Sequence, residues 1–266
     1  MHSWSLPVLL VLAPALLPYA RGWGRLSVAL PGVLRPWRPA AFAAGMLVLF
    51  AASRSPLAML DYRYLTAHMA QHLLLMTLAA PLILLGDPVI TLLYGLPPPM
   101  SGLLRRRCVP QRFSALLTHP VFCWLACTAV VIGWHIPALF QLGMRSRLGH
   151  AFEQVTFLSS GLLFWWPVIQ PWPAAARWPS WSIPVYLFAA TLPCDALAAF
   201  LCFCNRVVYA HYLNALHASQ IAVLKDQACA GALMWVWVTF AYLFPAAGLT
   251  FRLLSPERRF KERQVV

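Results

Sequence analysis

Two histidines lie four residues apart at the start of the segment TAHMAQHLLLMTLAAPLILLGDP, residues 66–88. On a helix this spacing places both side chains on one face, so we expect His68 and His72 to lie about one turn apart. Imidazole rings are costly in lipid, and neutral imidazole is a good ligand for copper, zinc, iron or nickel. The pair therefore predicts either a metal site or a polar contact with the carbonyls of neighbouring helices.

Further polar side chains lie in the segments GWHIP, HAFEQ and DQACAG. Met76 follows His72 by four residues and shares its helix face. Thioether sulfur together with imidazole favours Cu(I). Packing or capping roles remain alternatives for each of these residues. The candidate metal ligands are His68, His72, His135, His150, Met76 and Asp226. The residues expected to support them or the fold are Glu153, Gln154, Gln227 and Asp195.

Asp195 differs from the others because it lies in the middle of the apolar segment LPCDALAAF. An ionised carboxylate is expensive inside a membrane, so we expect a buried partner or a protonated acid there. Pro193, two residues before Asp195, loosens the helix there. A structural polar contact and a functional role are both compatible with this pattern.

The composition is that of a membrane protein with several helical spans. Hydrophobic residues make up 61% of the 266 residues and charged residues only 10%, whereas soluble domains contain about 25% charged residues. The net charge of +13 is typical of basic loops retained in the cytoplasm, so we expect no nucleic-acid partner. The seven cysteines have irregular spacing, which favours buried free thiols over a disulfide framework.

Apolar stretches predict an all-α transmembrane bundle of about seven spans. We expect one membrane domain over residues 1–250 and a basic cytoplasmic tail over 251–266. The first stretch is predicted to be a retained anchor, because MHSWS carries no Lys or Arg. The predicted spans are 4–20, 39–53, 66–86, 118–138, 151–170, 183–205 and 229–247.

The basic residues predict the orientation of these spans. Most Lys and Arg lie in alternate loops and in the tail, which places the N-terminus outside and the C-terminus in the cytoplasm. The histidines of the third, fourth and fifth spans, with Asp226 before the seventh, then meet at the outer face. At the other face, Gly86, Asp87 and Pro88 predict a helix stop, and the WWP motif at 165–167 predicts aromatic anchors.

Four segments occur in one order: HMAQHLLLMTLAAPLILLGDP, GWHIPALFQLGM, HAFEQVTFLSSGLLFWWPVI and DQACAGALMWVW. Together they resemble the CtaG-type cytochrome c oxidase assembly factor family, over roughly residues 60 to 245. The family positions matched here are His68, His72, His135, His150, Asp226 and Gln227. The family often has a Glu-His pair where this chain has Glu153-Gln154, so Gln154 is expected to support the site, or the site has fewer ligands.

The resemblance implies a non-enzymatic, multi-pass protein of the bacterial plasma membrane that helps mature a haem-copper oxidase and is linked to copper supply. Expected partners are oxidase subunits, membrane lipid and periplasmic copper chaperones. The GxSxG, HExxH and phosphate-loop signatures of common enzymes are absent from the sequence. Two alternatives remain at this point: a haem-binding membrane redox protein and a copper permease.

Overall fold

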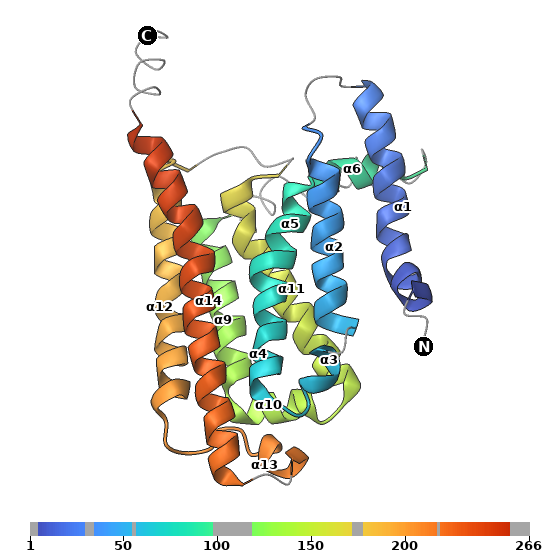
Figure 1. The fold of residues 1–266 in the computed structure, drawn as a ribbon. Helices are drawn as coiled ribbons and strands as arrows, with labels where there is room; N and C mark the ends of the chain where they lie inside the picture. The colour runs from blue at the N-terminus through green and yellow to red at the C-terminus, as the bar shows by residue number, and fades with distance from the viewer. Residues whose placement is uncertain are drawn as a thin grey trace.

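The computed structural model describes residues 5–29, 35–54, 57–97, 119–171, 178–216 and 219–255. All regular elements within these ranges are helical, which confirms the all-α class. Long helices run alternately up and down in one bundle (Figure 1). They are α1 (Ser5–Ala29), α2 (Arg38–Arg54), α4 (Leu65–Leu73) continued by the π-helical segment η1 (Leu74–Ala79) and α5 (Ala80–Leu85), α9 (Pro120–His135), α11 (Arg147–Ile169), α12 (Ser182–Phe203) and α14 (Gln220–Leu254). The short helices are α3 (Leu57–Leu60), α6 (Pro88–Gly95), α10 (Pro137–Met144) and α13 (His211–Leu216).

Several of these helices suit a membrane. Three are long and apolar enough to cross one: the continuous rod Leu65–Leu85, α12 and α14. Helices α9 and α10 reach that standard only as a pair, and they meet at a bend of 77°. The described structure thus supports a membrane protein with three such helices, or four with the bent pair. The expected total of seven crossings and the expected orientation stay predictions.

Helix α14 is much longer than the span predicted from its apolar residues, 229–247. It begins at Gln220, where the Ser219 hydroxyl accepts a hydrogen bond from Ala222 N at 3.3 Å, and it ends at Leu254. The polar first turns remain helical although they lower the local hydropathy. Asp226 therefore lies inside α14 rather than before it. Helix α14 continues through residues 251–254, where the predicted tail begins; the tail itself stays a prediction, and residues 256–266 lie outside the described ranges.

The predicted helix stop at Gly86-Asp87-Pro88 is confirmed, whereas the fourth predicted span, 118–138, is broken by a bend after His135. Helix α9 ends at His135, directly before the Ile136-Pro137 break. Helix α5 ends at Leu85, and Asp87 adopts a left-handed conformation with φ of 47°. The Arg38 guanidinium pairs with the Asp87 carboxylate at this end of the bundle.

The polar segments converge at the other end of the bundle. The start of α4, the end of α9, helix α10 and the starts of α11 and α14 all lie at the lower end in Figure 1, with α13 below them. The predicted grouping at one end is therefore confirmed. The membrane face to which this end belongs stays a prediction.

The core packs tightly around η1. A Cβ added at Gly161 of α11 would lie 2.9 Å from the Met76 Cα, so glycine is what allows α11 to approach this segment. Trp165 is only 5% exposed, and its Nε1 donates to the Met76 carbonyl at 2.9 Å. Trp165 is thus a core residue, and the expectation that it anchors the chain at the interface is wrong.

Candidate metal site at one end of the bundle

His68, His72 and Glu153 form a compact buried group, which we call the histidine–carboxylate site. Their ligand atoms lie within 4.8 Å of one another. The two Nε2 atoms are 2.8 Å apart, and each lies 3.3 Å from Glu153 Oε1. His68 is 1% exposed, His72 4% and Glu153 0%. Helical spacing brings the two rings together as predicted, and α11 adds the carboxylate from the side.

Aromatic rings hold both imidazoles in place. Phe157 of α11 stacks on His72 with ring centroids 3.9 Å apart. Phe140 of α10 meets the His68 ring edge to face at 5.1 Å. These contacts restrict rotation of the imidazoles and exclude water from their faces. The bend between α9 and α10 is what turns Phe140 under the α4 N-terminus.

A second group overlaps the first through His68. The ligand atoms of Asp61, His68 and His150 also lie within 4.8 Å of one another, and His150 Nε2 is 3.4 Å from Asp61 Oδ2. Burial raises the pKa of the Asp61 carboxyl, although the nearby His68 opposes the shift. Tyr212 fixes the local backbone by donating to the Asp61 carbonyl at 3.0 Å.

Asp61 is a candidate ligand that the sequence analysis missed. It lies in the turn DYRY between α3 and α4, outside any apolar span. The sequence signal that could have identified Asp61 is its position just before the span that carries His68 and His72, at the end of the bundle where the other acidic residues were expected. Residues in a connection have no helical periodicity, so the sequence could not predict which way the Asp61 side chain points.

Several buried polar atoms of the histidine–carboxylate site have no hydrogen-bond partner among the described residues. They are His68 Nδ1, His72 Nδ1 and Glu153 Oε2. Buried polar groups normally find partners, and leaving one unpaired costs about 1–3 kcal/mol. The atoms that converge are the two Nε2 atoms and Glu153 Oε1, and imidazole nitrogen with carboxylate oxygen suits a divalent or monovalent transition-metal ion.

His135 and Met76 lie beside this site rather than in it. His135 Nδ1 donates to the Val131 carbonyl at 2.7 Å, and Tyr209 donates to the His135 carbonyl at 3.1 Å. The His135 side chain lines a cavity together with His72 and Met76. His72 is therefore shared by the cavity and the carboxylate contact.

Asp226 and Gln227 hold helices together and lie outside both groups of candidate ligands. Asp226 Oδ2 accepts from Leu65 N at 2.6 Å, and its Oδ1 accepts from the Thr66 hydroxyl at 2.6 Å. It thus caps α4 from α14, at a helix start whose own N-cap side chain makes no such bond. Gln227 accepts from Val208 N at 2.9 Å and donates to the Arg206 carbonyl at 3.2 Å.

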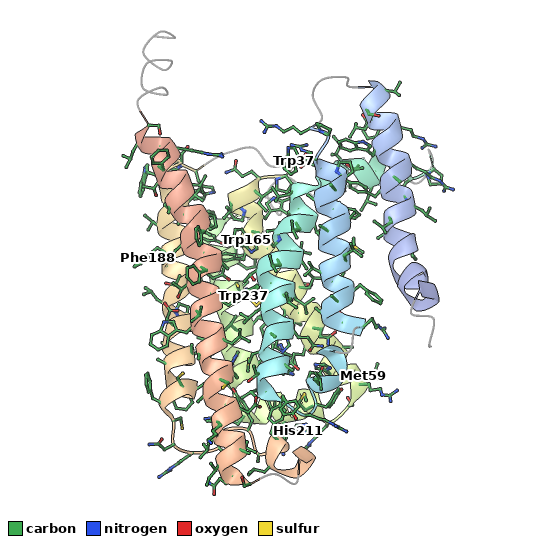
Figure 2. The ribbon with its side chains drawn as sticks, viewed as in Figure 1. Trp37, Met59, Trp165, Phe188, His211 and Trp237 are labelled. Atoms are coloured by element: carbon green, nitrogen blue, oxygen red, sulfur yellow. The ribbon has the colours of Figure 1, made fainter. Side chains whose placement is uncertain are left out.

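The remaining predicted residues are not brought into the cluster. Gln154 is half-buried on α11 and belongs to neither candidate group. Asp195 is half-buried on α12, and its Oδ1 has no hydrogen-bond partner among the described residues. His211, a further histidine in the connection before α14, begins α13 at the lower end of the molecule (Figure 2) and belongs to neither group.

Comparison with known proteins gives one family and three relatives. A family described as cytochrome c oxidase caa3 assembly factor matches residues 17–255. An uncharacterized protein of Mycobacterium bovis and one of Mycobacterium tuberculosis are each 25% identical over 207 residues, covering 75% of this chain. An uncharacterized protein of Mycobacterium leprae is 26% identical over 208 residues, covering 74% of the chain. The matched region spans 31% of the length of each relative. No solved structure matches.

Proposed function

Because this chain belongs to the cytochrome c oxidase caa3 assembly factor family, we propose that it holds a copper ion as cargo and delivers it to a haem-copper oxidase subunit. The observation that carries the proposal is the buried convergence of His68, His72 and Glu153 within 4.8 Å. The chain acts as a carrier rather than an enzyme. It works in the bacterial plasma membrane, and basic loops place the site at the outer face.

The ligand types fit a carrier that must release its ion. Two neutral imidazoles and one carboxylate bind copper, yet no thiolate is present among these three residues. Glu153 offsets one unit of the ion's charge within the buried site. Incoming copper comes from periplasmic copper chaperones, and the oxidase subunit that receives it docks at the same end of the bundle, within the lipid.

The haem alternative is poorly served by His68 and His72. Axial haem ligands approach the iron from opposite faces of the ring. These two imidazoles lie on one helix with their Nε2 atoms 2.8 Å apart, so both reach toward the same point. A pair of this kind suits a single small ion.

The proposal is tested by loading the purified full chain with Cu(I), desalting it, and measuring copper by elemental analysis. We expect the parent to retain copper and a His68→Ala/His72→Ala variant to retain less of it. Gln154→Ala, on the same turn of α11 as Glu153, is the matched control and should retain copper. Absence of copper from the parent, or equal retention in the double variant, overturns the proposal.

A second experiment tests delivery. In cells that lack this chain, oxidase purified from membranes should contain less copper than oxidase from the parent strain. Restoring the parent chain should restore the copper content, and restoring the His68→Ala/His72→Ala variant should not. Normal oxidase copper in the deletion strain would refute a delivery role.

A further inference from the structure

A cavity lies further along the bundle from the histidine–carboxylate site, and its walls carry sulfur rather than carboxylate. It is lined by side chains from α4, η1, α9, α11, α12 and α14, among them His72, Met76, His135, Cys194, Met234 and Tyr242. We call it the thioether cavity. His72 belongs to both places, because its Nε2 contacts Glu153 while its ring lines the cavity.

His135 is arranged as a metal ligand would be. Its Nδ1 donates to the Val131 carbonyl, so the neutral ring carries a lone pair on Nε2. That Nε2 is buried and has no partner among the described residues, and the side chain is only 9% exposed. Metal-binding histidines usually donate their other ring N–H to a carbonyl or carboxylate in this manner. An unpaired lone pair facing an apolar cavity otherwise costs stability.

Met76 is held in position by an unusual stretch of backbone. It lies in η1, and π-helical turns inside α-helices occur frequently at functional sites. Trp165 donates to the Met76 carbonyl at 2.9 Å, and Trp237 donates to the Thr77 hydroxyl at 2.7 Å; both tryptophans are labelled in Figure 2. Two indoles, from α11 and α14, therefore hold the segment that presents Met76.

We propose that the thioether cavity is a Cu(I) site distinct from the histidine–carboxylate site, with His135 Nε2 and the thioethers of Met76 and Met234 as ligands. The inference rests on the proposed copper-carrying function and adds a second position for the ion. Soft thioethers select Cu(I), whereas the carboxylate of Glu153 also suits harder divalent ions. The cost of burying an ion rises steeply with its charge, so a neutral ligand set favours the monovalent form.

His72 connects the two positions. The carboxylate site and the thioether cavity adjoin at this side chain, because its Nε2 contacts Glu153 and its ring lines the cavity. Copper enters the carboxylate site as Cu(I), and the cavity holds it in the same oxidation state, away from water.

The test uses full-length protein labelled with selenomethionine and loaded with Cu(I) in a Glu153→Gln background, where the first site is weakened. X-ray absorption at the copper edge should show selenium as a direct neighbour of copper. Copper with only nitrogen and oxygen neighbours would overturn the inference while leaving the proposed function intact. A parent chain that binds no copper would overturn both.

Competition with a chromophoric Cu(I) chelator gives the affinity. A Met76→Leu/Met234→Leu variant keeps similar volume, so its fold should be retained. Losing a residue that supports a metal ligand lowers metal affinity by about 10- to 100-fold. Because Met76 and Met234 are proposed as ligands themselves, we expect the affinity of the double variant for the cavity ion to fall by at least that much. Met144→Leu, buried in α10 outside the cavity, is the matched control and should bind as the background does. Equal affinity in the double variant contradicts the proposal; if that variant does not fold, the selenium result alone decides.

Discussion

Replacing Glu153 by glutamine removes one negative charge from the histidine–carboxylate site and almost nothing else. The side chain is 0% exposed, and its Oε1 lies 3.3 Å from the Nε2 atoms of both His68 and His72. Glutamine has the same shape, and its amide oxygen can still accept a hydrogen bond from one imidazole. We therefore expect the variant to fold and to bind copper less tightly.

The size of the effect follows from the geometry. An ion held by these two nitrogens lies within about 4 Å of the carboxylate, where unit charges interact by about 4 kcal/mol at an effective dielectric constant of about 20. Part of that is offset because an ionised carboxylate no longer has to be buried. A net loss of about 2–4 kcal/mol corresponds to a dissociation constant about 30- to 1000-fold higher for this site.

The assay is competition against a chromophoric chelator at one pH and one ionic strength, with every chain carrying Met76→Leu/Met234→Leu so that copper in the thioether cavity does not contribute. The control is Gln154→Glu, which places a carboxylate on the adjacent residue without removing Glu153; we expect its dissociation constant to stay within about threefold of the parent, well under the tenfold change that 1.4 kcal/mol produces. A shift of less than threefold in Glu153→Gln would refute the idea that this carboxylate neighbours the ion.

Three further predictions concern the scaffold, and each is measured by melting of the detergent-solubilised chain. Asp226→Ala removes the cap of α4 and should destabilise the fold by about 1–2 kcal/mol, with Asp195→Ala as the comparison that leaves α4 capped. Gly161→Ala should cost about 1–3 kcal/mol, because its Cβ meets the Met76 backbone at 2.9 Å; Gly133→Ala, which has nothing within 4 Å, should be neutral or stabilising, and equal losses would contradict the close packing. Burial lowers the pKa of His211, so its stabilising contribution is present above about pH 6.5 and is lost as the pH falls. His211→Gln should therefore lose less melting temperature than the parent between pH 7.5 and 5.5, and parallel pH curves would contradict this.

The sequence by itself determined the features that depend on one helix. The composition placed the chain in a membrane, and the four-residue spacing placed His68 and His72 on one face, as the structure confirms. The stop at Asp87 could be predicted from the adjacent Gly86, Asp87 and Pro88, which are typical helix-ending residues, and the helix ends there in the structure.

Only the tertiary structure decided which side chains meet across helices. Glu153 joins the histidines and Asp226 caps α4 because of the rotation and axial position of α11 and α14. Gly161 allows close approach to η1, and Trp165 fixes that segment, so packing sets those positions. Hydropathy indicates the apolar face of a helix, but it carries no information about the rotation and axial position of the helix packed against that face. For that reason the histidine pair could be read from spacing, whereas the carboxylate at its centre and the thioether cavity beside it required the folded bundle.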